Sequence, residues 1–399
     1  MRAKRWIGRT AGIVSVTKRF VRSLEQGQHA QRNGRPGQGG RFSNGRRALA
    51  ALSLIPALFA ALPLPAQEAP APAPTASELP AFQFSTLDRV RQRGYVICGS
   101  TQQMAGFAQR TSDGLWSGFD VDICRAVAAA VFGDPSRVEF RPLSGTSRFA
   151  HLQQGDVDLL SRNAAWTMQR DTRYGATYVA TSFYDGQAFM AREDVQAVSA
   201  YELSDVTVCV AAGSEEARVV EDFFTQNGSA YEPLLYEDRD DLAVAYRSGR
   251  CEVISGPASW LQAIRRTVPE PARHIILPER LSKNPFGPVV LSANEQWLTI
   301  VRWTIFAMIN AEELGVTSQN IDSLTSARTP AIRLLLGLDG DLGTPLGLSP
   351  TWMRDVIRGV GNYGEVYDRH FGSGTNAPLL RGQNGLWTTG GLMFAPPFQ

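Results

Sequence analysis

Two stretches of this sequence repeat the order strand, helix, strand, helix, strand, and this repetition limits the possible folds more than any other feature. Apolar runs of strand length alternate with segments that are apolar on one face at helical spacing. Strands that alternate with helices are typical of a parallel sheet covered by helices. In the first stretch the elements are expected at residues 95–100, 120–133, 138–143, 147–155 and 156–161. In the second they are expected at residues 207–213, 214–228, 231–236, 238–249 and 251–256.

The two stretches predict an α/β protein of two lobes, each a mostly parallel sheet flanked by helices. The apolar-centred segments 184–193 and 284–292 are expected to be strands that carry the chain from one lobe to the other and back. Residues 294–315 have the pattern of a long amphipathic helix. The predicted boundaries are 85–188 and 286–399 for lobe 1, which includes a C-terminal helical extension, and 189–285 for lobe 2.

The first 66 residues have the pattern of an export signal. An apolar run at 48–62 follows an arginine pair and ends in small residues. This run is too short to span a bilayer, which needs about 20 residues, although a membrane anchor is the alternative. Residues 67–84 are rich in Pro and Ala and predict an extended linker. We therefore expect that residues 1–66 are a signal peptide and that the protein is exported.

Charge is spread unevenly along the chain. Twelve of the 40 Lys and Arg residues and one of the 38 Asp and Glu residues precede residue 67, which leaves 28 basic and 37 acidic residues after it. An acidic protein is not attracted to phosphate backbones or to anionic membrane surfaces. We therefore expect no nucleic acid partner.

The four cysteines are Cys98, Cys124, Cys209 and Cys251, and all of them follow the leader. Their spacing lacks the close pairs of a zinc site. In an oxidising compartment disulfides persist, and four cysteines allow three pairings. The predicted lobes favour Cys98 with Cys124 and Cys209 with Cys251, one bridge in each lobe; four free buried thiols are the alternative.

Candidate binding residues follow the strands, because ligands of open parallel sheets bind beyond the carboxyl ends of the strands. After the apolar strand at 156–161 the chain turns polar at Ser161, Arg162 and Asn163, and Arg170 follows. A guanidinium fits a carboxylate in bidentate geometry. This loop therefore predicts one wall of a site for a ligand with a carboxylate. The alternative for Arg170 is a surface ion pair with Asp171.

In lobe 2, Ser214 and Glu215 open a predicted helix. Backbone N–H groups at such a position favour anions. The predicted site therefore has an arginine on one lobe and a helix N-terminus on the other. The alternative for Ser214 is a plain helix cap, which does not exclude a contact with the ligand.

Several stretches resemble the periplasmic solute-binding proteins of the polar amino acid ABC-transporter class, and within it the general L-amino-acid-binding proteins of alphaproteobacteria. The similarity extends from about Leu87 to Pro397, nearly the whole mature chain. The matching stretches are GFDVDICRAVAAAVFGDPSRVEFRPLS, GDVDLLSRN, RDTRYG, FYDGQAFM, AYRSGRCEVI, WTIFAMINAEELGVTSQNID, VGNYGEVYDRHFG and LWTTGGLMFAPP.

The resemblance implies a type II periplasmic-binding-protein fold that closes over an amino acid and docks on a membrane permease. In the family an arginine twelve residues after the aspartate of the third strand binds the ligand carboxylate, and Asp158 and Arg170 keep this spacing. The further ligand contacts that the resemblance implies are Asn163, Thr101, Met104, Phe107 and Ser214.

Three positions depart from the family's pattern. Ala165 stands where a Ser or Thr is usual, and Glu215 stands where a Thr normally helps to hold the carboxylate. Pro257 stands where an aspartate normally pairs with the ligand's ammonium. A buried ammonium without a partner is costly. Either Glu215 replaces the aspartate, or the ligand is a carboxylate without an amine or a cation that prefers Glu215.

The resulting expectation is the substrate-binding component of an amino acid ABC importer, with no catalytic residue, metal or cofactor. A receptor that presents its ligand to a sensor is not distinguished from it by the sequence. A dehydratase on the same fold is the enzyme alternative. It would need a general acid or base in the site, and Glu215 is the one candidate there.

Overall fold

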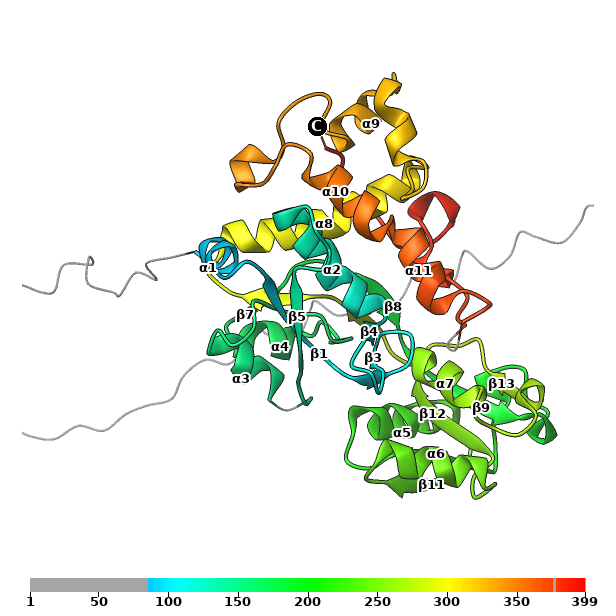
Figure 1. Ribbon diagram of the computed structural model, residues 1–399. Coiled ribbons are helices and arrows are strands. Elements are labelled where there is room, and N and C mark those ends of the chain that lie inside the picture. Colours follow the sequence, from blue (N-terminus) through cyan, green and yellow to red (C-terminus); the bar gives the residue numbers. More distant parts are fainter. Residues whose placement is uncertain (1–84, 146, 376–377, 399) are drawn as a thin grey trace, which may run out of the picture. The chain divides into compact units, whose positions relative to one another are not determined.

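The computed structural model describes residues 85–145, 147–375 and 378–398 (Figure 1). The predicted leader (1–66) and linker (67–84) lie outside these residues. Within the described ranges, no helix is both long and apolar enough to cross a membrane.

Lobe 1 is built on a five-stranded sheet with one antiparallel member. Its strands are β1 (Val96–Ser100), β5 (Val138–Pro142), β6 (Leu159–Leu160), β7 (Ala176–Tyr178) and β15 (Val289–Leu291). They lie in the order β5-β1-β6-β15-β7, and β1 is parallel to both β5 and β6. β15 runs antiparallel to β6 and β7, because it belongs to the segment that returns from lobe 2. The prediction of a mostly parallel sheet is confirmed.

Helices of lobe 1 begin and end at capping residues that are visible in the sequence. They are α1 (Thr86–Arg93), α2 (Phe119–Phe132), α3 (Arg148–Gln153), α4 (Met168–Arg173) and α8 (Glu295–Glu313). Ser85 and Asp88 form a capping box at the start of α1, and Gly133 ends α2 with a left-handed φ of 69°. A disulfide joins Cys98 on β1 to Cys124 on α2, as predicted.

A small antiparallel sheet between β1 and α2 was not predicted. Its strands are β2 (Gln103–Met104), β3 (Ala108–Arg110) and β4 (Trp116–Ser117). Gly118 closes it with a φ of 141°, and a Cβ at this position would lie 2.1 Å from the carbonyl oxygen of Phe107. Glycine is therefore required where this sheet leads into α2.

Lobe 2 repeats the arrangement with its own five-stranded sheet. Its strands are β9 (Gln187–Arg192), β10 (Val206–Ala211), β11 (Tyr231–Tyr236), β12 (Val253–Pro257) and β13 (His274–Ile276). Its helices are α5 (Glu215–Asn227), α6 (Arg239–Arg247) and α7 (Ala258–Arg265). The strand order is β11-β10-β12-β9-β13, with β10 parallel to β11 and β12 and with β9 antiparallel to its neighbours. Cys209 and Cys251 form the second predicted disulfide.

The two predicted crossing segments pair with each other. β8 (Phe183–Asp185) and β14 (Asn284–Phe286) form a two-stranded antiparallel ribbon, with Asp185 opposite Asn284. β8 leads directly into β9 of lobe 2, and β14 leads into β15 of lobe 1. This ribbon therefore connects the two lobes.

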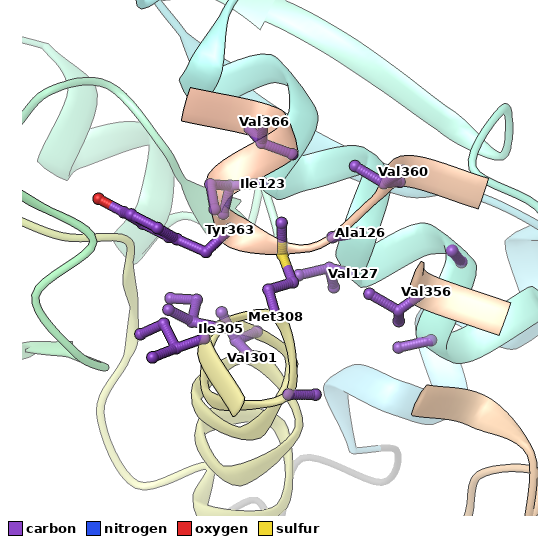
Figure 2. Packing of buried hydrophobic residues seen from close by; sticks show 14 of the residues in the cluster. Ile123, Ala126, Val127, Val301, Ile305, Met308, Val356, Val360, Tyr363 and Val366 are labelled. Carbon is purple, nitrogen blue, oxygen red and sulfur yellow. The ribbon is translucent and has the colours of Figure 1, made fainter. Parts of the chain in front are cut away.

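The C-terminal extension packs against lobe 1. Its helices are α9 (Pro330–Leu335), α10 (Trp352–Val360) and α11 (Tyr363–Phe371). Figure 2 shows Met308 of α8 among apolar side chains of α2, α10 and α11, and these side chains belong to one buried cluster. The labelled members include Ile123, Val127, Val301, Ile305, Val356, Val360, Tyr363 and Val366. Short 3-10 helices lie at Glu193–Val195, Ala200–Glu202, Pro271–Arg273, Ile321–Ser326, Thr344–Leu346, Gly382–Asn384 and Trp387–Thr389.

Candidate functional site

The polar loop after β6 is held by a buried carboxylate at the start of α2. Ser161 donates from Oγ to Oδ1 of Asp120 at 2.9 Å, and the backbone N–H of Asn163 donates to Oδ2 at 2.7 Å. Asn163 has a φ of 36°, a strained conformation that this hydrogen bond helps to hold. Burial raises the pKa of Asp120 to about 6, although the two hydrogen bonds and Arg162 oppose the shift. The predicted loop is therefore fixed from below by Asp120.

Three arginines gather beside this loop. Arg170, on α4, donates from Nη1 to the carbonyl oxygen of Ala165 at 2.8 Å, and Arg162 donates from Nε to the carbonyl oxygen of Leu143 at 2.8 Å. Arg148, the first residue of α3, belongs to the same group. None of the three is in an ion pair within the part of the chain that the structure describes, and the alternative of an Arg170–Asp171 pair is not observed there.

Arg148 is the residue of this group that sequence reasoning missed. It is only 8% exposed, and its Nε has no hydrogen-bond partner among the described residues. Burial and the positive charges of Arg162 and Arg170 lower the pKa of Arg148 to about 10. Burial and the charge of Arg170 likewise lower the pKa of Arg162. The charge of Asp120 opposes the shift at Arg162, and the three neighbouring guanidinium groups are a candidate site for an anion.

An aromatic pair flanks the arginines. Tyr178, on β7, donates from its hydroxyl to the same Ala165 carbonyl oxygen at 2.7 Å, and its ring stacks on Trp166 with centroids 5.4 Å apart. Burial raises the pKa of Tyr178, so its hydroxyl stays protonated as a donor at neutral pH. Ala165, where a hydroxyl side chain was expected by resemblance, therefore acts here through its backbone carbonyl.

The remaining predicted residues of lobe 1 divide into two groups. Thr101 and Met104 are half-buried and follow the carboxyl end of β1. Phe107 has no exposed surface, and its ring packs among other aromatic rings of the core. These rings are Phe119, Phe183, Phe286 and Phe371. Phe107 thus lies in the core of the described structure and presents no surface to a ligand.

At the start of α5 in lobe 2, Ser214 acts as a helix cap. Its hydroxyl accepts from the N–H of Ala217 at 3.1 Å and donates to the carbonyl oxygen of Ala211 at 2.6 Å. Glu215 points outward, because its side chain is 76% exposed and lies 3.7 Å from Arg218. The structure therefore does not bring Glu215 toward the sheet.

Glu216, one residue further, lies inward instead. Its side chain is 18% exposed and forms an ion pair with Arg239 at the start of α6. Arg239 also lies over the ring of Trp260, 5.2 Å from its centroid. The Trp260 ring in turn packs on Gly256, where a Cβ would lie 2.7 Å from the ring. These residues follow β10, β11 and β12, so the carboxyl ends of three parallel strands bring them together.

Pro257 ends β12 and stands opposite Gln187 of β9. It is half-buried and offers no polar group from its side chain. The nearest acid along the connecting strands is Asp185, which is buried and accepts from the N–H of Gly186 and from both the N–H and the hydroxyl of Ser259. Burial raises the pKa of Asp185. Its hydrogen bonds tie β8 to the start of α7.

Metal binding has no support in the described ranges, where no group of three or more His, Cys, Asp or Glu side chains could hold an ion. The site is thus a set of guanidinium, hydroxyl and carboxylate groups. Such a set can bind and orient a charged small molecule through ion pairs and hydrogen bonds.

This fold and these charged strand ends are those of a solute receptor, and comparison with known families agrees. Residues 96–320 match the bacterial extracellular solute-binding proteins, family 3. The chain belongs to this family.

Individual relatives match a larger share of the chain. The chain is 44% identical to the general L-amino acid-binding periplasmic protein AapJ of Rhizobium johnstonii, over 79% of this chain and 94% of the relative. It is also 44% identical to the glutamate/glutamine/aspartate/asparagine-binding protein BztA of Rhodobacter capsulatus, over 80% and 95%. A solved ABC transporter periplasmic binding protein from Brucella ovis, with glutathione bound, is 42% identical with a TM-score of 0.73, over 79% of this chain and 100% of that one.

Proposed function

We propose that this protein is the extracytoplasmic binding component of an ABC importer and that its ligand is a small amino acid or amino-acid-like molecule. The observation that carries the proposal is Arg148, a buried guanidinium beside Arg162 and Arg170 with no carboxylate paired to it among the described residues. A ligand carboxylate would supply the missing negative charge. The relatives named for amino acid binding and the glutathione-bound neighbour support the same class of ligand.

Arg170 is proposed to hold the α-carboxylate in bidentate geometry. The carbonyl oxygen of Ala165 already accepts from Nη1 of Arg170, so the guanidinium is oriented before the ligand arrives. The loop that contains Ser161 and Asn163 would line the same wall, because Asp120 fixes it there. Thr101 and Met104 would complete this wall.

Closure of the two lobes over the ligand would follow from the ribbon of β8 and β14. A hinge motion needs a few connecting residues that absorb the change in backbone dihedrals. The ligand would stabilise the closed state only through contacts that the open state lacks. The residues at the strand ends of lobe 2 are the source of those contacts in this proposal.

The partner would be the membrane permease of the transporter, and the protein would act in the periplasm after removal of its signal peptide. The proposed boundaries remain 85–188 and 286–399 for lobe 1 and 189–285 for lobe 2. AapJ and the Brucella ovis structure are named as periplasmic proteins, and these names and the two disulfides support this location.

A carboxylate without an amine is the second candidate ligand. Pro257 favours it, because this position offers no acidic side chain to an ammonium group. The enzyme alternative gains no comparable support, since Glu215 lies outward.

The test is a thermal-shift screen of the mature chain against L-amino acids and the acids that lack their α-amino group. A ligand at 100 times its Kd raises the free energy of unfolding by about 2.7 kcal/mol, which a melting curve detects. Stabilisation by L-amino acids supports the first proposal. Stabilisation only by the acids without an amine supports the second, and the absence of any shift from either set contradicts both.

A further inference from the structure

An amino acid ligand, if the proposed function is right, brings an ammonium group that needs a negative partner. Four other acidic side chains near the strand ends are either fully hydrogen-bonded or exposed. Asp120 and Asp185 are buried, and both carboxylate oxygens of each accept hydrogen bonds from the protein. Asp238 is exposed and caps α6 by accepting from two backbone N–H groups. Glu215 is exposed beside Arg218.

Glu216 differs from Asp120 and Asp185 in having an oxygen without a donor among the described residues, and from Asp238 and Glu215 in its burial. Its side chain is 18% exposed, and Oε1 is bound by Arg239. No residue of the described ranges donates a hydrogen bond to its other carboxylate oxygen, Oε2. Glu216 therefore keeps one carboxylate oxygen for a ligand while the other oxygen stays anchored.

The backbone around Glu216 is anchored as well. Gln187, which is buried at the start of β9, donates from Nε2 to the carbonyl oxygen of Glu216 at 2.8 Å and to Oγ of Ser255 at 2.9 Å. Arg239 is held in turn by the face of Trp260. The carboxylate is thus fixed through its side chain and its main chain before any ligand binds.

We propose that Glu216, through Oε2, accepts the α-ammonium group of the ligand, and that Arg239 is the residue that positions it. The ligand class is then α-amino acids with an unmodified ammonium group. The carboxylate of the ligand pairs with the arginines of lobe 1, and its ammonium pairs with lobe 2. Each lobe recognises one charge of the zwitterion, so the ligand favours the closed state by contacts with both.

The experiment measures binding by isothermal titration calorimetry to three matched pairs of probes. The pairs are L-glutamate with glutarate, L-alanine with propionate, and L-leucine with 4-methylpentanoate. The wild-type protein is expected to prefer the amino acid of the best-bound pair. Glu216→Gln should weaken that amino acid by about 100-fold, because an ionic hydrogen-bond partner is lost, and should leave the acid without an amine within about threefold.

Glu215→Gln is the matched control, since it removes the neighbouring charge from the same helix. It should change both affinities by no more than about threefold, as expected for an exposed carboxylate. Equal losses in the two variants, or an equal loss of the amino acid and its partner acid in Glu216→Gln, would overturn the proposal. Melting curves of both variants exclude a folding defect, and Glu216→Asp, which keeps the charge, should retain part of the preference.

The role of Arg239 is tested by its own pair of variants. Arg239→Lys should keep most of the preference for the amino acid, whereas Arg239→Met should reduce it without weakening the acid that lacks the amine. If Arg239 had a purely structural role, its loss would weaken the binding of both probes together.

If the wild-type protein binds none of the six probes, the proposed function fails and this inference fails with it. If Arg170→Ala abolishes binding while Glu216→Gln does not alter the preference, this inference alone fails.

Discussion

Arg170 donates from Nη1 to the carbonyl oxygen of Ala165 at 2.8 Å, and this hydrogen bond orients its guanidinium group. Tyr178 donates to the same oxygen at 2.7 Å. One backbone carbonyl therefore organises a cation and an aromatic side chain.

Arg170→Ala should weaken ligand binding by about 100-fold or more, because a charge-assisted hydrogen-bonded partner of the carboxylate is lost. Calorimetric titration with the amino acid that binds best measures the change. Arg173→Ala is the control, since Arg173 lies on the same helix but is exposed. Retained affinity in Arg170→Ala would remove Arg170 from the site.

Arg148→Met should separate stability from binding. The ligand-free protein should become more stable by about 1–3 kcal/mol, because a buried charge beside two like charges is replaced by an apolar side chain of similar length. The ligand should no longer stabilise the variant. Urea unfolding with and without ligand measures both effects. Arg137→Met, at a site where the side chain is 59% exposed, should change neither. A loss of ligand-free stability in Arg148→Met would contradict the prediction.

Asp120→Asn should alter the dependence of stability on pH. The folded-state pKa of Asp120 is about 6, above its ordinary value of 3.8, so the folded chain binds this proton more tightly than the unfolded chain. The stability from this group is therefore fully present below pH 3.8 and is lost as the pH rises through about 6. In Asp120→Asn this loss should be absent, so stability relative to wild type should increase from pH 4 to pH 7. Melting curves of both proteins across this pH range measure the effect. A stability difference between variant and wild type that does not change with pH would refute this prediction.

Reduction of the two disulfides should lower the free energy of unfolding by about 2–4 kcal/mol for each bridge. The bridges close segments of 26 and 42 residues in separate lobes. Unfolding with and without dithiothreitol tests the effect on the wild-type protein. In the double variant Cys98→Ser with Cys124→Ser, dithiothreitol should lower the free energy of unfolding only by the contribution of the Cys209–Cys251 bridge. An equal response in the variant and the wild type would indicate that the first bridge contributes nothing.

The sequence by itself determined the order of the strands and helices in the two repeated stretches, and it favoured the observed pairing of the cysteines. Helix and strand patterns depend on local periodicity, so the predicted strand at 231–236 has the bounds of β11 and the predicted helix at 294–315 contains α8. The polar loop after β6 was also visible, because an apolar strand that ends in Ser, Arg and Asn is a local signal. The position of the loop that contains Ser161, Arg162 and Asn163 could therefore be predicted from the sequence.

Only the tertiary structure decided which of several neighbouring charged side chains are buried. Successive helix positions differ in direction by roughly 100°, so Glu215 and Glu216 look alike in sequence but differ in exposure, 76% against 18%. Arg148 joins Arg170 because α3 and α4 pack on one sheet, a long-range contact that no local pattern encodes. Phe107 is buried in the core because its ring packs against Phe183 and Phe371, which are distant in the sequence. Burial is a property of the packed chain, and burial determines which charges are left for a ligand.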